Sequence, residues 1–244
     1  MVGARGPVAA VVFDLLFTLV HPGAYPCGLD RNGWLASVLG VDRQVLEARW
    51  ASFEPALEAG RAPPSRDGLG PELAWVRDVA AECQVEVTRE QLVAIEAGWD
   101  LTRRAALLDP PPASIEALGG LRRQGVRIGV LSNTHALELR SWEESPLAAL
   151  VDVVAFSHEI GACKPHPLAY ACVLAGLGVP AGSAAYVGDG SSDELAGARS
   201  AGFGLVVLAD EAASRWAPDD LPRLQAQADA SVGSLTDVAG LLDN

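Results

Sequence analysis

Side chains that can take part in catalysis stand just after three short apolar runs of this sequence. Asp14 follows the first of these runs, Ser132 and Asn133 follow another, and Asp189 follows a third. Lys164, the only lysine in the chain, lies between them in the sequence. A carboxylate can attack a substrate to form a covalent intermediate, and a hydroxyl and a cation can stabilise the charge that develops. Together they supply a carboxylate, a hydroxyl, a lone cation and a second acid, which are the groups that a catalytic site could use.

The apolar runs that precede these residues are β-branched and bounded by turn residues, which is typical of buried strands. They cover Val8–Phe13, Val126–Leu131, Val151–Phe156, Ala184–Val187 and Leu205–Leu208. Segments of helical period alternate with them and end at glycines, at Ser114–Gln124, Pro167–Leu177 and Asp193–Ala201. The alternation predicts an α/β fold with a doubly wound, parallel, Rossmann-like sheet. Because ligands bind at the carboxyl ends of such strands, the polar residues are expected to meet in one crevice.

A long segment with little strand signal separates the first strand from the second. We expect residues 20–106 to form a helical cap, and residues 1–19 and 107–244 to form the α/β core. The helical patterns of the cap are Gly33–Leu39, Arg43–Leu57, Glu72–Cys83 and Arg89–Arg103, and Ala62–Pro71 reads as a loop rich in proline and glycine. After Asp210 the pattern is weak until a short helix near Leu235–Leu242.

Four motifs in order give the chain a resemblance to the haloacid dehalogenase-like (HAD) superfamily along nearly its whole length. They are Phe13–Leu19 (FDLLFTL), Leu131–Asn133 (LSN), Lys164–Pro165 (KP) and Val187–Glu194 (VGDGSSDE). Each motif alone is weak, since an aspartate after a strand is usually a turn or cap residue. Their joint order is specific, and the resemblance implies a hydrolase with a Rossmann-like core and an inserted cap.

The resemblance also implies the role of each motif residue. Asp14 would be the nucleophile, Thr18, Ser132 and Lys164 would stabilise the transferring group, and Asn133 would contact the substrate. Mg²⁺ would be held by Asp14, by the backbone carbonyl of Leu16 and by Asp189, with Asp193 as a further metal residue or as the cap of the next helix. The implied substrate is a small phosphorylated molecule, hydrolysed through an aspartyl-phosphate.

Two positions depart from the family pattern. Leu16 stands where phosphatases of the family usually have a second aspartate, which protonates the leaving oxygen, and Phe17 stands where glycine is usual. General acid–base help is typically worth about 10² to 10⁴ in rate. His21 is open as a substitute acid or as a loop residue, and the tryptophans of the cap are open as packing residues or as a stacking surface.

Three functions compete because of Leu16. The first is a phosphatase acting on esters with good leaving groups. The second is a carbon–halogen hydrolase like the 2-haloacid dehalogenases, because halide leaves without a proton and Tyr170 fits that branch; against it, Asp189 and Gly190 replace the Ser-Asn of the branch. The third is a catalytically weak member that binds a ligand or a protein partner.

Composition and net charge limit the partners and the location that we expect for the protein. Half of the 244 residues are hydrophobic, and the formal net charge is −13. The excess negative charge disfavours nucleic acid as a partner, and no apolar stretch is long enough for a membrane span. We expect a cytoplasmic enzyme that acts on a small molecule, and the sequence leaves a homodimer open.

Overall fold

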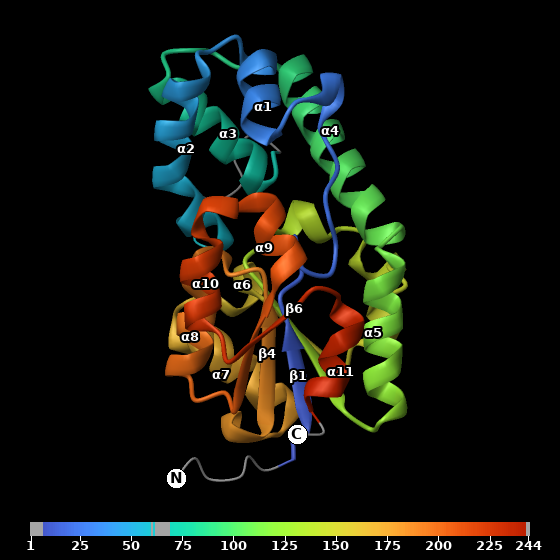
Figure 1. Cartoon of the computed structure of the whole chain (residues 1–244). Coiled ribbons are helices and arrows are strands. Elements are labelled where there is room, and N and C mark those ends of the chain that lie inside the picture. Colours follow the sequence, from blue (N-terminus) through green and yellow to red (C-terminus); the bar gives the residue numbers. More distant parts are fainter. Residues whose placement is uncertain (1–6, 60, 62–68, 243–244) are drawn as a thin grey trace.

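The computed structural model describes residues 7–59, 61 and 69–242, and its centre is one parallel sheet (Figure 1). Within this part of the chain six strands pair in the order β3-β2-β1-β4-β5-β6, all parallel. The strands are β1 Ala10–Phe13, β2 Arg127–Ser132, β3 Val153–Phe156, β4 Ala184–Gly188, β5 Leu205–Ala209 and β6 Ala230–Val232. The parallel, doubly wound sheet predicted from the alternating pattern is confirmed.

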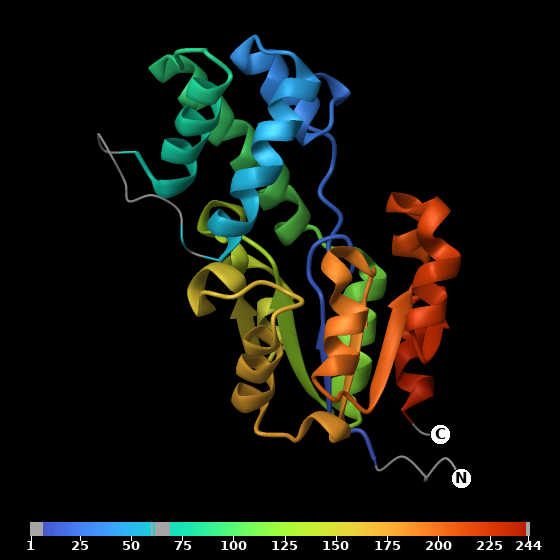
Figure 2. The same ribbon diagram turned by 90° about the vertical axis from the view of Figure 1, so that its left-hand side faces the viewer.

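Helices lie on both sides of this sheet and above its carboxyl edge (Figures 1 and 2). They are α1 Arg31–Leu39, α2 Arg43–Glu58, α3 Pro71–Glu82, α4 Arg89–Leu108, α5 Pro112–Arg123, α6 Ser157–Ile160, α7 Pro167–Leu177, α8 Glu194–Ser200, α9 Asp210–Trp216, α10 Leu221–Gln227 and α11 Val238–Leu241. Two of the short 3₁₀ turns matter for the site, η2 Ala136–Leu139 and η6 Ser191–Asp193. None of the described helices combines the length and the apolar character that crossing a membrane requires.

Alternation along the strands divides the core into two apolar layers. In β1, Val11 and Phe13 join the layer that includes α5, whereas Ala10 and Val12 join the layer that includes α7 and α8. Figure 1 shows α5 and α11 on one side of the sheet and α7, α8 and α10 on the other. Since both faces are covered, the strands are apolar throughout rather than alternately polar. Polar residues are therefore expected where strands end.

Helices α1 to α4, here called the cap helices, lie above the carboxyl ends of the strands and have an apolar cluster of their own (Figure 2). All four cap tryptophans belong to it: Trp34, Trp50, Trp75 and Trp99. The rings of Trp50 and Trp75 are in contact, with centroids 3.9 Å apart. The tryptophans thus pack inside the cap. The division of the chain at residues 19/20 and 106/107 stays a prediction.

The segment after Asp210 holds more structure than its pattern indicates. It forms α9, α10 and the edge strand β6, before η8 (Leu235–Asp237) and α11. β6 is Ala230–Val232, a strand too short to show alternation. α9 begins with two acidic residues, and α10 has a proline in its first turn. Most of the loop predicted at Ala62–Pro71 lies outside the described residues.

Candidate active site

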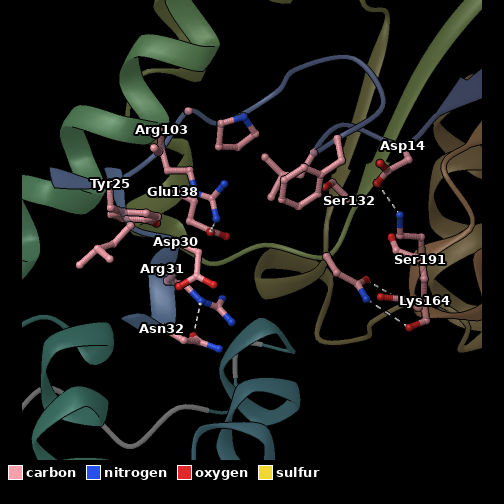
Figure 3. A pocket seen from close by; sticks show the side chains of 18 of the residues that line it. Asp14, Tyr25, Asp30, Arg31, Asn32, Arg103, Ser132, Glu138, Lys164 and Ser191 are labelled. Carbon is pink, nitrogen blue, oxygen red and sulfur yellow. Dashed lines mark hydrogen bonds and ion pairs between the residues drawn. The ribbon is translucent and has the colours of Figure 1, made fainter. Parts of the chain in front are cut away.

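The polar residues that end β1, β2 and β4 meet at the carboxyl edge of the sheet, as their order in the sequence predicts. Asp14 follows β1, Ser132 is the last residue of β2, and Asp189 follows β4. β1 lies between β2 and β4, so these three positions are neighbours. Each side chain is at most 5% exposed. A cavity of about 600 Å³ opens above Asp14 and Ser132, and Lys164 also lines it (Figure 3).

Lys164 lies between two carboxylates. Its Nζ is 2.5 Å from Asp14 Oδ1 and 2.5 Å from Glu194 Oε2. Burial alone would lower the pKa of Lys164, but the two carboxylates raise it above its ordinary value, so the ammonium stays charged. Asp14 therefore faces a permanent positive charge.

Glu194 belongs to the site although the sequence motifs did not predict a role for it. It is fully buried at the start of α8, and its two oxygens accept hydrogen bonds from three donors. Tyr186 Oη donates to Oε2 at 2.7 Å, Lys164 Nζ donates to the same oxygen, and the Gly190 amide donates to Oε1 at 2.9 Å. Because both oxygens are already engaged, Glu194 holds Lys164 in place and is poorly suited to bind a metal.

Asn133 holds the backbone of Lys164 from the other side. The Lys164 amide donates to Asn133 Oδ1 at 2.7 Å, and Asn133 Nδ2 donates to the Lys164 carbonyl at 3.2 Å. Asn133 also lines the cavity, so the substrate contact expected for it and this structural contact are compatible. The loop after β2 and the loop before α7 are thereby joined beside Asp14.

The carboxyl groups of Asp14 and Asp189 are close enough to repel each other. Burial, reinforced by the negative charge of Glu194 and opposed by Lys164, raises the pKa of Asp14 to about 6. Burial also raises the pKa of Asp189, and the Asp14 carboxylate adds to this. Two neighbouring buried acids with raised pKa values indicate a functional site, because a stable fold does not require such a pair.

An oxygen-binding cation fits between these two acids. Asp14 Oδ2 is buried and has no hydrogen-bond partner among the described residues. Asp14, Asp189 and Glu194 each have a carboxylate oxygen within a group whose members lie within 4.8 Å of one another. Leu16, whose backbone carbonyl is expected to bind the metal, lines the same cavity. Oxygen donors of this kind suit Mg²⁺.

Asp193, predicted as a further metal residue, is exposed on the same loop. It follows Ser192, and both residues have left-handed backbone conformations with φ of 51° and 54°. Asp193 is not in the buried acidic group, and its side chain makes no capping hydrogen bond to α8. The reversal of the chain in this turn instead directs its neighbour Glu194 to Lys164.

Hydroxyl groups of two motif residues, Ser132 and Thr18, lie near Asp14. Ser132 Oγ is buried, without a hydrogen-bond partner among the residues described, and lines the cavity. The Thr18 hydroxyl is also buried and close enough to Asp14 to lower the pKa of that carboxyl. Both are placed to donate to a group that binds at Asp14.

Phe17, which stands where the family pattern predicts glycine, has a left-handed backbone conformation. Its φ is 71°, a conformation that side chains other than glycine rarely adopt and that typically costs about 1 to 3 kcal/mol. The Phe17 amide donates to the Val20 carbonyl at 2.7 Å, which holds the turn closed. Phe17 lines the cavity, so here a large apolar side chain narrows a region that glycine would leave open.

His21 lies apart from the cavity that contains Asp14. It lines a second cavity of about 260 Å³ together with Glu211 and Arg215. Burial, with the nearby Arg215, lowers the pKa of His21. This position gives no support to a role for His21 as a substitute acid. Tyr170 does not line that cavity either, and its buried hydroxyl donates to the Glu194 carbonyl at 2.9 Å.

The far end of the large cavity is polar and comes from the cap helices and η2. Arg103 of α4 and Glu138 of η2 form a buried ion pair, with Nη2 2.7 Å from Oε1. Arg31 and Asn32, at the start of α1, lie beside this pair (Figure 3). None of these four residues belongs to a motif, and only the three-dimensional fold brings them to the cavity.

Comparison with known proteins gives one family and several named relatives. Residues 36–202 match the family model described as haloacid dehalogenase-like hydrolase. Phosphatase MT3486 of Mycobacterium tuberculosis is 32% identical over 192 residues, which cover 71% of this chain and 82% of that protein. The phosphoserine phosphatase of Thermus thermophilus is 31% identical over 170 residues, 68% of this chain and 64% of that protein.

Solved structures of similar shape include both phosphatases and dehalogenases. A HAD phosphatase from Thermococcus onnurineus aligns with a TM-score of 0.60 and 20% identity, over 96% of this chain and 98% of that one. The L-2-haloacid dehalogenase of Xanthobacter autotrophicus aligns with a TM-score of 0.59 and 20% identity, over 97% and 99%. At such identities these structures support the fold and do not distinguish the two activities.

Proposed function

The chain belongs to the haloacid dehalogenase-like hydrolases, and on this basis we propose that it is a magnesium-dependent phosphatase of small phosphorylated molecules with Asp14 as nucleophile. The observation that carries the proposal is the buried Asp14 carboxylate, which has one oxygen bound by Lys164, one oxygen without a protein partner, and Asp189 beside it. The names of the two curated relatives support phosphate as the group transferred.

The reaction proceeds in two steps at Asp14. A carboxylate oxygen bonds to phosphorus, and the bond from phosphorus to the ester oxygen breaks. Water then attacks phosphorus in the aspartyl-phosphate, its bond to Asp14 breaks, and inorganic phosphate leaves. The charged Lys164 and the hydroxyls of Ser132 and Thr18 are fixed donors that stabilise the negative charge of the transferring group.

Magnesium is the cofactor that the acid pair suits. Asp14 and Asp189 would hold it, with the backbone carbonyl of Leu16 as the third protein ligand. When bound, Mg²⁺ would neutralise the repulsion between the two carboxylates and the charge of the phosphate group. Asp193 is better suited to remain in solvent than to bind the metal, because it is exposed and outside the acidic group.

Leu16 determines which substrates are favoured. Its side chain packs partly against the core and lines the cavity, and it offers no proton to the ester oxygen. The leaving oxygen then takes its proton from water, so esters whose leaving group carries negative charge well are hydrolysed fastest. Aryl and acyl phosphates belong to this class.

Carbon–halogen hydrolysis is the second candidate, and Leu16 is the observation that favours it, since halide needs no proton to leave. The arrangement around Asp14 weighs against it. Asp189 adds a negative charge beside the nucleophile, which a metal-free reaction would have to tolerate. Tyr170, which fits the dehalogenase pattern in sequence, does not line the cavity above Asp14.

One screen separates these functions. The wild type and Asp14→Asn are assayed side by side with phosphate esters, acyl phosphates and 2-haloacids, each with Mg²⁺ and with EDTA. Phosphate release that requires both Mg²⁺ and Asp14 supports the proposal. Halide release that persists in EDTA would establish the dehalogenase instead, and no turnover of any class would favour a binding protein. A cytoplasmic location and a homodimer stay predictions from the sequence.

A further inference from the structure

A buried histidine lies where the cap helices meet the loop after β2. His135 stands just before η2, and its ring centroid is 5.5 Å from that of Trp99 in α4. Glu72 of α3 and Glu138 of η2 both lie beside the imidazole, and Arg103 of α4 pairs with Glu138. All four polar side chains are buried. They are here called the seam cluster: Glu72, Arg103, His135 and Glu138.

Each ring nitrogen of His135 faces a carboxylate. Nδ1 is 3.8 Å from Glu72 Oε1, and Nε2 is 3.6 Å from Glu138 Oε2. An ionised carboxylate only accepts hydrogen bonds, whereas a neutral imidazole has one donor nitrogen and one acceptor nitrogen. A neutral His135 therefore places a lone pair against one of the two carboxylates. The imidazolium, which has a donor on each nitrogen, matches both.

Both carboxylates of the seam cluster are ionised. Burial opposes the ionisation of Glu72, but His135 and the backbone amide that Glu72 accepts lower its pKa to about 2. Burial opposes the ionisation of Glu138 as well, but Arg103, with smaller contributions from His135 and Arg31, lowers the pKa of Glu138. Arginine stays charged in proteins, and imidazole is the side chain that ordinarily changes its charge between about pH 5 and 8. His135 is thus the member of the cluster that responds to pH near neutrality.

The proton on His135 determines the charge balance of the seam cluster. Two carboxylates and one guanidinium are in contact there, so the imidazolium brings the sum to zero and its loss leaves one negative charge in excess. Arg31 acts on Glu138 from α1, but its Nε is engaged by Asn32. A buried carboxylate that loses its partner is strongly destabilised, because it has left water without compensation. The cluster is therefore expected to separate when His135 is neutral.

One hydrogen bond shows where the separation would occur. The Leu137 amide donates to Glu72 Oε1 at 3.0 Å, a buried contact that joins η2 to α3 across 65 residues of sequence. On the other side of His135, Arg103 and Glu138 line the large cavity above Asp14 (Figure 3). Movement of α3 away from η2 therefore reaches the wall of that cavity through the same cluster.

We propose that His135 is a proton-sensitive contact between the cap helices and the core. With its proton, the imidazolium holds Glu72 against Glu138 and keeps the cap closed over the cavity; without it, α3 is released from η2. The inference goes beyond the proposed function, and it does not depend on the reaction at Asp14, since closure of the cap would act on any ligand of the cavity.

Hydrogen exchange of the Leu137 amide tests this proposal, because that amide is bonded to Glu72. All proteins in the test carry Asp14→Asn, since the pKa of Asp14, about 6, would otherwise add a pH dependence of its own. The protection of Leu137, corrected for the intrinsic exchange rate, should fall on the order of tenfold or more between pH 5.5 and 8.5. The amide of Val130, in the interior of the sheet, should keep its protection.

Two variants remove the proposed contact from opposite sides. His135→Gln has no ionisable ring, and Glu72→Gln keeps an oxygen for the Leu137 amide while it removes the charge. Each should abolish most of the pH dependence of Leu137 protection, and either one serves if the other does not fold. His158→Gln is the control, because this half-buried histidine of α6 contacts the Thr134 carbonyl, with Nδ1 at 3.1 Å, and lies outside the seam cluster. It should retain the full pH dependence.

A second measurement follows the proton itself. The chain has four histidines, so the NMR signal of the His135 ring is identified by its loss in His135→Gln. The midpoint of its titration should coincide with the midpoint of the change in Leu137 protection. Leu137 protection that is independent of pH, that changes equally in His135→Gln, or that changes while the His135 ring keeps one charge state from pH 5.5 to 8.5 would overturn the proposal. None of these measurements uses turnover, so each result holds whether or not the protein is a phosphatase.

Discussion

Asp189 and Asp193 stand in one loop, yet Asp189 is buried beside Asp14 and Asp193 is exposed to solvent. We therefore expect Asp189→Asn to abolish the response to Mg²⁺ and to lower kcat/KM by at least about a hundredfold, because it removes one of the two acids proposed to hold the metal. Asp193→Asn is the matched control and should change kcat/KM by less than about fivefold. Titration of activity against Mg²⁺ measures both. Equal losses in the two variants would restore Asp193 as a metal residue.

Asp14→Asn should stabilise the metal-free protein while it abolishes turnover. Burial raises the folded-state pKa of Asp14 to about 6 from an ordinary 3.8, so keeping the group ionised in the fold costs free energy above pH 6. The cost shrinks as the pH falls through 6 and is absent below the unfolded pKa. Asparagine, which carries no charge, should raise the free energy of unfolding by on the order of 1 to 3 kcal/mol at pH 7.5 in EDTA, and by little at pH 4.

Mg²⁺ should reverse this difference in stability between the wild type and Asp14→Asn. On the proposed function, Mg²⁺ should raise the Tm of the wild type by binding its folded state, whereas Asp14→Asn should show a much smaller rise. Denaturant unfolding at the two pH values, with and without Mg²⁺, measures both effects. If Asp14→Asn were less stable than the wild type in EDTA at pH 7.5, the burial argument for Asp14 would be wrong.

Glu194→Gln should slow the reaction although Glu194 does not line the cavity above Asp14. It removes one of the two carboxylates that hold the Lys164 ammonium, and we expect kcat to fall by roughly ten- to a hundredfold. Tyr186→Phe removes only the hydroxyl that donates to Glu194 and should lower kcat by a few fold, in line with about 1 kcal/mol for one hydrogen bond.

A positioning role and a merely structural role of Glu194 differ in their readouts. Positioning predicts a fall in kcat at saturating Mg²⁺ with little change in KM, and a larger effect in Glu194→Gln than in Tyr186→Phe. Loss of stability alone would lower the amount of folded protein and leave kcat per folded molecule unchanged. Unfolding curves and active-site titration with a phosphate mimic separate the two.

Leu16 predicts that the rate depends on the acidity of the leaving group. Alkyl phosphates should be slower than aryl phosphates by about 10² or more, because nothing at this position protonates the leaving oxygen. Leu16→Asp should reduce this difference in rate by accelerating alkyl esters most. The gain should require Mg²⁺, because without it the new carboxylate beside Asp14 would raise the pKa of one of the two carboxyl groups.

Leu16→Asn is the control for this comparison, because it has the size and polarity of aspartate but no acidic proton. It should leave the difference in rate between alkyl and aryl esters as it is in the wild type. Rates measured over a series of phosphate esters give, for each variant, the slope of log(kcat/KM) against the pKa of the leaving group. A flat slope in the wild type would mean that another group already supplies the proton.

Residues that end buried strands were predictable, and residues placed by turns and by distant helices were not. Asp14 and Asp189 follow apolar runs, so the sheet alone brings them together. Glu194 stands next to Asp193, and only the left-handed backbone at Ser192 and Asp193 determines which of the two faces Lys164. Serine and aspartate do not require such a conformation, so the sequence carried no local sign of it.

The other features that the sequence did not predict also depend on contacts between distant parts of the chain. β6 was missed because an edge strand of this length has no room for a periodic pattern. Arg31, Arg103 and Glu138 were missed because they come from three segments far apart in the chain, and they meet only when the cap helices lie over the sheet. Their charge looked like that of ordinary surface residues.

Helix α4 belongs both to the cap and to the core. It begins in the apolar cluster of the cap, with Ile95 and Trp99, and ends in the core layer of α5, with Ala106 and Leu107. A break inside a continuous helix leaves backbone N–H and C=O groups without partners. A cap taken from another protein would therefore have to continue α4 in the same helical register. Arg103 lies between the two halves, so its ion pair with Glu138 depends on the register of the whole helix.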